Sequence, residues 1–219
     1  MEFFLDTANI EEIRQAARWG VITGVTTNPS LAAKEGIGDF GSYRDAVLEI
    51  ASIIDGPISV EVVSQDVEGM TLEGKDIATW MPQAVVKIPS TPAGFSTISA
   101  LAREGIKVNQ TLCFSVNQAL LGARAGSHFI SPFVGRLDDA GHDGMAIVAD
   151  MVEAMRRYGY GVRIMAASIR YPLHCVAAAK AGVDVATIPF KVLTQMMQHP
   201  LTDAGVAKFA QDWKSTVKV

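Results

Sequence analysis

Eight short runs of mostly apolar residues recur along the 219-residue chain, separated by longer stretches with helical periodicity. The runs hold successive apolar residues instead of a strict in–out alternation, as is typical of parallel strands covered on both faces. The predicted strands are Glu2–Asp6, Gly24–Thr26, Ile58–Val63, Ala84–Ile88, Lys107–Leu112, His128–Ser131, Arg163–Ala166 and Asp184–Ile188. Strands that alternate with helices in this way predict an α/β fold built on a parallel sheet.

Amphipathic stretches between these runs supply the helices. The clearest are Ile10–Trp19, Tyr43–Ile54 and Ala146–Tyr158. Their boundaries carry matching signals: Pro172 suits a first helical turn, and glycines suit helix ends at Gly105, Gly126 and Gly182.

The strand count favours one architecture. Eight strands in a chain of this length predict a single (β/α)8 TIM barrel over residues 1–219. The alternative is an open doubly wound sheet, but no GxGxxG motif follows any predicted strand, which weakens a dinucleotide-binding reading.

An extra helix is predicted after the barrel. The breaker His199-Pro200 precedes a periodic segment, Thr202–Lys214, which starts with a capping candidate, Thr202 or Asp203. Residues 202–219 are therefore predicted to form a C-terminal helical arm. Its apolar positions, spaced i, i+3, i+4 and i+7, are Val206, Phe209, Ala210 and Trp213. Spacing alone favours a lid packed on its own barrel over an arm that docks on a neighbouring subunit.

The net charge, the N-terminus and the cysteines limit which partners and which cellular compartment are expected. The net charge is −4 and no basic run appears, so nucleic acid and anionic membrane are poor partners. The N-terminus lacks the pattern of a signal peptide, and no apolar run approaches the roughly 20 residues of a membrane span. Cys113 and Cys175 stand in apolar contexts without metal-type spacing, which indicates reduced core thiols in a cytoplasmic protein.

One lysine stands at the closing end of a hydrophobic strand. Ala84–Ile88 carries Lys87, although lysine is among the side chains that are least often buried. In one interpretation its stem packs in the core and its ammonium reaches water. In the other, apolar surroundings favour the neutral amine, which can attack a carbonyl.

Polar residues stand at the ends of the other strands, where the active site of such a barrel lies. Each has an ordinary explanation: Asp6 could cap a helix, Asn28 could form a turn, and Glu61 could form a salt bridge to Lys87 with no catalytic role. Together they converge from at least six strands, which favours a catalytic lysine. The residues at these ends are Asp6, Asn28, Glu61, Lys87, Asn109, Thr111, Ser131, Ser168 and Arg170.

This set suits aldol chemistry on a sugar phosphate. A desolvated Lys87 forms a Schiff base with a ketone, and this electron sink weakens the adjacent carbon–carbon bond. Glu61 with Thr111 suits proton transfer through water, and Asp6 can take a proton from a substrate hydroxyl. The donors that suit a phosphate group are Arg136, Ser168 and Arg170.

A metal or another cofactor is not expected. The acidic segment 137–143 could ligate a metal, but a solvated loop with Asp143 near the next helix is favoured. His174 and His199 lack partners at ligand spacing, and no GxSxG motif occurs. The sequence therefore predicts cofactor-free, metal-free Schiff-base chemistry.

Ordered motifs along the whole chain resemble those of the transaldolases, in particular the short-chain transaldolase and fructose-6-phosphate aldolase subfamily. They are FFLDTANIEEI, GVTTNPSL, VKIPST, KVNQTLCFSVNQALLGARAG, SPFVGRLDD, AASIR and HPLTDAGVAKFAQDW. The resemblance implies a cytoplasmic enzyme of the pentose phosphate pathway that moves a dihydroxyacetone unit from sedoheptulose 7-phosphate to glyceraldehyde 3-phosphate. It also implies a homo-oligomer, typically a decamer of two pentamers with exchanged C-terminal helices, which favours the docking arm over the lid.

The resemblance also implies roles for individual residues. Lys87 would form the Schiff base, Asp6 would act as acid and base, and Glu61 with Thr111 would place the catalytic water. The residues implied to bind substrate hydroxyls are Asn28, Asn109 and Ser131, and those implied to hold the phosphate are Arg136, Ser168 and Arg170.

Three positions distinguish the transaldolases of this subfamily from its aldolases, which release dihydroxyacetone instead of transferring it. The similar aldolases, which release free dihydroxyacetone, carry glutamine at Glu61, tyrosine at Phe133 and tend to alanine at Ser131. A phenol near the Schiff base could protonate the enamine, which phenylalanine cannot, so transfer is favoured. Two alternatives stay open: an aldolase of the same fold, and a non-catalytic sugar-phosphate-binding or scaffold barrel.

Overall fold

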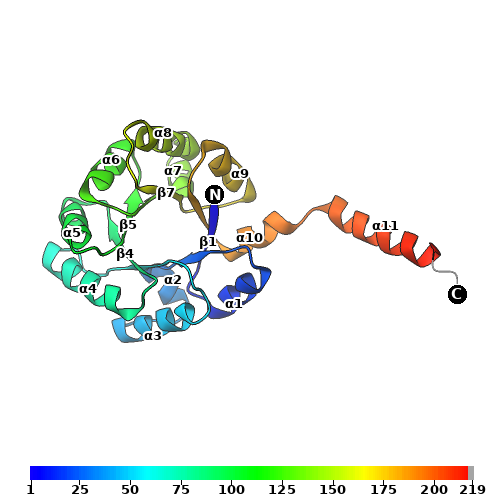
Figure 1. Ribbon diagram of the computed structural model, residues 1–219, viewed down its shortest axis with the longest axis horizontal. Helices are drawn as coiled ribbons and strands as arrows, with labels where there is room; N and C mark the ends of the chain where they lie inside the picture. The colour runs from blue at the N-terminus through cyan, green and yellow to red at the C-terminus, as the bar shows by residue number, and fades with distance from the viewer. Residues whose placement is uncertain (217–219) are drawn as a thin grey trace.

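Eight parallel strands close into a barrel in sequence order, with helices around the outside (Figure 1). The computed structural model describes residues 1–216. The strands are β1 (Glu2–Asp6), β2 (Gly24–Thr26), β3 (Ile58–Glu61), β4 (Ala84–Pro89), β5 (Val108–Cys113), β6 (Phe129–Pro132), β7 (Arg163–Ala166) and β8 (Val185–Ile188). The predicted (β/α)8 barrel is confirmed, because β8 pairs with β1 and leaves no sheet edge.

Helices cover the outer face of the strands. They are α1 (Ile10–Trp19), α2 (Pro29–Lys34), α3 (Phe40–Ala51), α4 (Val67–Trp80), α5 (Pro92–Arg103), α6 (Val116–Ala125), α7 (Val134–Asp139), α8 (Gly144–Arg157), α9 (Pro172–Ala181) and α10 (Phe190–Met197). A last helix, α11 (Pro200–Thr216), follows them and lies away from the barrel. None of these helices is both long and apolar enough to traverse a bilayer.

Capping groups set several helix boundaries. Gly126 and Gly182 end α6 and α9 with φ of 104° and 76°, and Gly105 has φ of 78° just after α5. Pro172 opens α9, so these predicted boundaries are confirmed. The prediction of Tyr43–Ile54 began too late, because the Asp39 side chain accepts backbone N–H bonds and starts α3 at Phe40.

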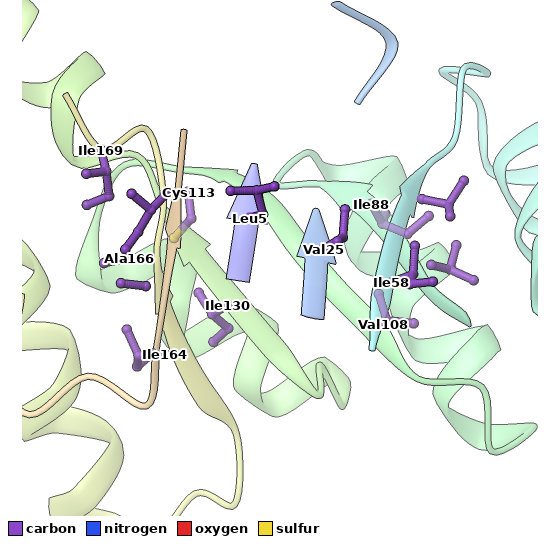
Figure 2. Packing of buried hydrophobic residues seen from close by; sticks show 14 of the residues in the cluster. Leu5, Val25, Ile58, Ile88, Val108, Cys113, Ile130, Ile164, Ala166 and Ile169 are labelled. Carbon is purple, nitrogen blue, oxygen red and sulfur yellow. The ribbon is translucent and has the colours of Figure 1, made fainter. Parts of the chain in front are cut away.

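Both faces of the strands are buried, as the continuous apolar runs require. Outward-facing residues such as Leu5, Val25 and Ile58 pack into one core between the strands and the helices (Figure 2). Inward-facing residues near the amino-terminal end form a second, smaller cluster. It contains Phe4, Val85, Phe129, Met165 and Val185.

This inner cluster closes the lower end of the barrel. The ring of Phe4 lies over Gly24, where a Cβ atom would approach the ring to 2.7 Å. Phe4 meets Phe129 edge-on with ring centroids 6.0 Å apart, and Arg163 pairs with Glu2 at 2.7 Å near the amino-terminal end. The predicted polar site residues lie on the other side of this cluster, in the carboxyl-terminal half of the interior, called here the barrel mouth.

The C-terminal arm differs from two predictions. Pro200 begins α11, and His199 Nδ1 accepts the Leu201 N–H at 3.2 Å, so the predicted cap at Thr202 or Asp203 is wrong. Val206 and Phe209 are 63% and 73% exposed. Helix α11 leads away from the barrel, which contradicts a lid on its own barrel (Figure 1). Residues 217–219 of the predicted arm lie outside the described part.

Candidate active site

A cavity of about 280 Å³ opens at the barrel mouth. Eight of the eleven predicted site residues line it. They are Asp6, Asn28, Lys87, Ser131, Phe133, Arg136, Ser168 and Arg170. The other three, Glu61, Asn109 and Thr111, stand on β3 and β5 beside Lys87, so the barrel brings the whole predicted set to one end.

Lys87 lies at the centre of this set. Its side chain is 5% exposed, and its amine nitrogen lies 3.2 Å from Glu61 Oε2. The same nitrogen donates a hydrogen bond to the main-chain oxygen of Thr27 at 3.2 Å. Glu61 and Lys87 are register partners on β3 and β4, so sheet pairing itself sets this contact. The amine is buried rather than delivered to open water, which contradicts the interpretation by snorkelling.

Asp6 ends β1 on another wall of the cavity. The hydroxyl of Thr26 donates to its Oδ1 at 2.7 Å, and Thr26 is in turn 2.6 Å from the hydroxyl of Thr187. Burial raises the pKa of Asp6, against the charge of Lys87, the Thr26 hydrogen bond and the charge of Lys34, which lower it. Asp6 is not a helix cap, because the Asn9 side chain caps α1.

A buried chain of polar groups lies behind Lys87. Asn109 is fully buried and faces inward beside it. Its amide nitrogen donates to Ser59 Oγ at 3.1 Å, and its oxygen accepts from Ser131 Oγ at 2.7 Å. These two bonds fix the orientation of the Asn109 amide and hold Ser131 at the cavity wall.

Thr111 lies one inward position above Asn109 on β5. Its hydroxyl is buried and has no hydrogen-bond partner within the described residues. The next residue, Leu112, has φ of 52°, and the register between β5 and β6 shifts here. A buried hydroxyl without a protein partner is a group that a bound water or substrate can satisfy.

Asn28 lines the cavity and also starts a helix. Its Oδ1 accepts the Leu31 N–H at 3.0 Å and caps α2, with Pro29 at the first helical position. The amide nitrogen of Asn28 is not used by this cap. The predicted turn at this position is therefore a helix cap.

The basic end of the cavity is built by β6, β7 and the segments that follow them. Ser168 has φ of 57°, and its oxygen accepts the Gly135 N–H at 3.0 Å. A Cβ at Gly135 would lie 2.3 Å from that oxygen, so only glycine permits this approach. Arg170 pairs with Asp139 at 2.8 Å, and the Arg136 guanidinium lies 5.1 Å from the centre of the Phe133 ring.

The acidic segment 137–143 has structural partners. Its first three residues belong to α7, so the predicted loop is wrong there. Asp138 pairs with His174 at 2.9 Å and accepts the Gly144 N–H, and Asp143 caps α8, as its position predicted. No group of three or more potential metal ligands occurs in the part of the chain that the structure describes.

The two cysteines are buried free thiols. Burial raises the pKa of Cys113 to about 12 and that of Cys175 to about 11. Both are therefore protonated at neutral pH, which agrees with their assignment to the core.

Several site residues were not predicted. Thr26, Thr187 and Lys34 line the cavity, and Ser59 and Thr27 hold Asn109 and Lys87 from behind. Thr26 and Ser59 occupy inward positions of their strands, a signal that the two-residue period of a strand carries. The Thr27 contact uses a main-chain oxygen, for which no side-chain pattern exists.

The fold and the mouth together define a (β/α)8-barrel enzyme with a buried lysine between two carboxylates. A family model described as Transaldolase/Fructose-6-phosphate aldolase matches residues 3–219. The chain belongs to this family, and it is an enzyme of the transaldolase class.

Similar proteins span the whole chain. A probable transaldolase of Dehalococcoides mccartyi is 55% identical over 100% of both chains. A probable transaldolase of Roseiflexus castenholzii is 55% identical over 98% of both, and probable transaldolase 1 of Listeria monocytogenes is 52% identical over 100% of both.

The fold also occurs far outside the family. The solved structure of a thiamine phosphate pyrophosphorylase from Pyrococcus furiosus superposes with a TM-score of 0.59 at 16% identity. It covers 90% of this chain and 93% of its own. At this identity the likeness shows the fold alone.

Proposed function

We propose that the protein transfers a dihydroxyacetone unit from sedoheptulose 7-phosphate to glyceraldehyde 3-phosphate through a Schiff base on Lys87. The products are erythrose 4-phosphate and fructose 6-phosphate. In this proposal the enzyme acts in the cytoplasm, in the non-oxidative pentose phosphate pathway. The observation that carries it is the buried Lys87 amine, which lines the same cavity as Asp6.

The first step is the attack of Lys87 on the ketone carbon of the donor. Two protein acceptors, Glu61 Oε2 and the Thr27 oxygen, lie 3.2 Å from the amine nitrogen. An ammonium has three N–H donors. Glu61 and Thr27 accept two of them, so the third N–H bond is left to point toward the substrate. Loss of this third proton places the nitrogen lone pair toward the ketone.

Imine formation then requires the loss of a water molecule. The carbinolamine oxygen must gain a proton as its bond to carbon breaks. Glu61 stands beside Lys87, and the hydroxyl of Thr111 is buried without a hydrogen-bond partner among residues 1–216. These two groups would hold one water between them and pass the proton through it.

Carbon–carbon cleavage follows from the protonated imine. Asp6 takes the proton of the C4 hydroxyl, the C3–C4 bond breaks, and the bonding electrons move into an enamine on Lys87. The raised pKa of Asp6 suits this role, because a carboxylate whose conjugate acid has a higher pKa is a stronger base toward the C4 hydroxyl. The reverse steps join the enamine to the acceptor aldehyde.

The donor hydroxyls have candidate partners around Lys87. Asn28 and Ser131 line the same cavity as Lys87. Asn109 is the register partner of Lys87 on β5, and its oxygen accepts a hydrogen bond from Ser131 at 2.7 Å. Groups that are fixed before binding lose little freedom when they hold a substrate.

The phosphate group fits the basic end of the cavity. Arg136 and Arg170 offer planar guanidinium groups, and Ser168 adds a hydroxyl. The pair between Arg170 and Asp139 is exposed and therefore weak, so a phosphate dianion can replace that carboxylate.

Phe133 favours transfer over release of free dihydroxyacetone. Its ring lines the cavity and packs against Phe114, with centroids 5.7 Å apart. A phenyl ring has no proton to give to the enamine, so the enamine persists until an aldehyde arrives. Release of free dihydroxyacetone by an aldolase of the same fold is the alternative function, and Phe133 is the residue that favours transfer instead.

The C-terminal arm supports assembly into a homo-oligomer. Helix α11 carries Leu201, Val206 and Phe209 at 63–75% exposure and lies away from its own barrel. Large exposed apolar side chains on an extended helix are typical of a surface that another subunit covers.

Borohydride trapping tests the proposal directly. Protein incubated with fructose 6-phosphate and then reduced is expected to gain the mass of a ketose or a dihydroxyacetone adduct. Lys87→Ala should gain none, whereas Lys34→Ala, which removes the other lysine of the cavity, should keep it. Wild-type protein that forms no adduct would sink the Schiff-base mechanism.

A second measurement separates transfer from release. Fructose 6-phosphate alone should yield little free dihydroxyacetone, and added erythrose 4-phosphate should yield sedoheptulose 7-phosphate. Rapid free dihydroxyacetone without an acceptor would assign the aldolase function instead. Wild-type binding of sugar phosphate without turnover of any donor would assign a non-catalytic barrel.

A further inference from the structure

The direction of the Lys87 amine depends on a main-chain oxygen outside β4. Thr27 follows the last residue of β2, and its oxygen accepts a hydrogen bond from the Lys87 amine nitrogen at 3.2 Å. Glu61 takes a second direction of the same nitrogen. The lone pair used in the attack therefore points into the cavity only while the Thr27 peptide keeps its place.

The side chain of Thr27 holds that peptide. Its main-chain N–H donates to the oxygen of Ser59 at 2.9 Å, and its hydroxyl Oγ1 lies 3.0 Å from the same oxygen. A hydroxyl has one hydrogen and two lone pairs. When that hydrogen is donated to the Ser59 oxygen, the hydroxyl oxygen Oγ1 of Thr27 can still accept a hydrogen bond from another donor.

Tyr43 supplies the donor for this bond. Its hydroxyl oxygen lies 2.6 Å from Thr27 Oγ1, and Tyr43 is 4% exposed on α3, outside the barrel wall. Burial raises the pKa of Tyr43 to about 12, while the Thr27 hydrogen bond opposes the rise. The phenol is therefore protonated at neutral pH and can donate to Thr27.

The chain of contacts runs from α3 to the reacting nitrogen. The Tyr43 hydroxyl donates to Thr27 Oγ1, the Thr27 hydroxyl donates to Ser59, and the Thr27 oxygen accepts from Lys87. Every residue in it is at most 4% exposed. In such surroundings water cannot readily replace a lost partner, so one missing hydroxyl shifts the groups that it held.

We propose that Tyr43 is a positioning residue for the reaction, which fixes the Thr27 carbonyl oxygen and thereby aims the Lys87 amine at the ketone. The proposal rests on the Schiff-base function above. Tyr43 does not touch the substrate, because the Thr27 segment lies between its hydroxyl and Lys87.

Tyr43→Phe tests the proposal because it removes one oxygen and keeps the ring against Trp80. The rate of adduct formation is measured in single turnover with borohydride quenching, at the alkaline plateau where proton loss is not limiting. The maximal rate is expected to fall about fivefold, the order of effect of one buried hydrogen bond, with little change in half-saturation by the donor.

Two variants of Thr27 test the same hydrogen bond through its other partner. Thr27→Val removes the hydroxyl and should slow adduct formation similarly, whereas Thr27→Ser keeps the hydroxyl and should restore the rate. Adding Tyr43→Phe to Thr27→Val should cost little more, because both changes break one connection.

Val47→Ala is the matched control for packing. Val47 lies one turn from Tyr43 on α3 and is fully buried, so its truncation loosens the same helix without removing a polar group. It should lower the melting temperature and leave the rate unchanged. The proposal is overturned if folded Tyr43→Phe forms the adduct at the wild-type rate, or if Val47→Ala slows it equally. Wild-type protein that forms no adduct would instead overturn the proposed function.

Discussion

Lys87 and Glu61 face each other across β3 and β4 as register partners, with the amine nitrogen 3.2 Å from Oε2. Their side chains are 5% and 16% exposed, so the pair is largely withdrawn from water. Removing one partner of a buried ion pair leaves the other charge uncompensated, which makes both positions sensitive to substitution.

Glu61→Gln is expected to slow adduct formation by about 10²-fold or more, because an amide cannot accept and return a proton. Single-turnover borohydride trapping measures the rate. Glu2→Gln is the control, since Glu2 pairs with Arg163 near the opposite end of the barrel. An unchanged rate in Glu61→Gln would remove this carboxylate from the proton path.

Asp6→Asn is expected to separate the two stages of the reaction. The variant should still form the reduced adduct with fructose 6-phosphate, while cleavage falls by about 10²- to 10⁴-fold. Mass spectrometry distinguishes the six-carbon adduct from the three-carbon adduct that remains after cleavage. An accumulated three-carbon adduct in Asp6→Asn would show that another group removes the proton.

The same substitution should stabilise the fold. Burial raises the pKa of Asp6, so the folded protein binds this proton more tightly than the unfolded chain. The contribution of Asp6 to the free energy of unfolding therefore falls as pH rises from the unfolded pKa through the folded pKa. At pH 7 the melting temperature of Asp6→Asn should exceed the wild-type value by about 2 °C, and the gap should close below roughly pH 4. A lower melting temperature at pH 7 would contradict this.

Phe133→Tyr should convert part of the transfer into release. A phenol at the cavity wall can protonate the enamine, so free dihydroxyacetone from fructose 6-phosphate alone should rise by about tenfold or more. Phe114→Tyr is the matched control, because it adds the same hydroxyl to the neighbouring ring. Equal release by the two variants, or none by Phe133→Tyr, would show that the phenylalanine does not protect the enamine.

Phe209→Asp should weaken the proposed assembly. The side chain is 73% exposed on α11, so a charge there costs the isolated subunit little but disrupts an apolar contact between subunits. Light scattering should show a lower mass for Phe209→Asp and an unchanged mass for Gln211→Asp on the same helix. A wild-type mass that is already that of one chain would refute the assembly.

Much of the fold follows from local patterns. The central residues of all eight strands were predicted, because burial on both faces imposes continuous apolar runs that need no knowledge of the partner strand. Strand ends shifted by one or two residues; β3, for example, ends at Glu61 instead of Val63. The lid prediction failed because an apolar stripe shows only that a helix face favours a contact, not which surface provides it.

Much of the candidate site was predictable because its side chains stand at or soon after the strand ends, although Arg136 lies on α7. A lysine at the end of an apolar run and polar residues at neighbouring ends are visible without coordinates, because parallel strands bring their carboxyl ends to one rim. The roles of these residues stay predictions until the adducts are measured. Thr187 and Thr26 were missed because each looks like an ordinary strand threonine until the closed barrel sets it 2.6 Å from the other.

The sequence by itself determined the alternation, the barrel and the lysine at its mouth, because hydrophobic periodicity and strand-end chemistry are local properties of a chain. The tertiary structure decided which groups hold that lysine. Barrel closure and register place Thr27 and Glu61 on its amine, and the packing of α3 brings Tyr43 to Thr27. These contacts join residues 16 to 60 positions apart, and only the folded chain gives them a common location.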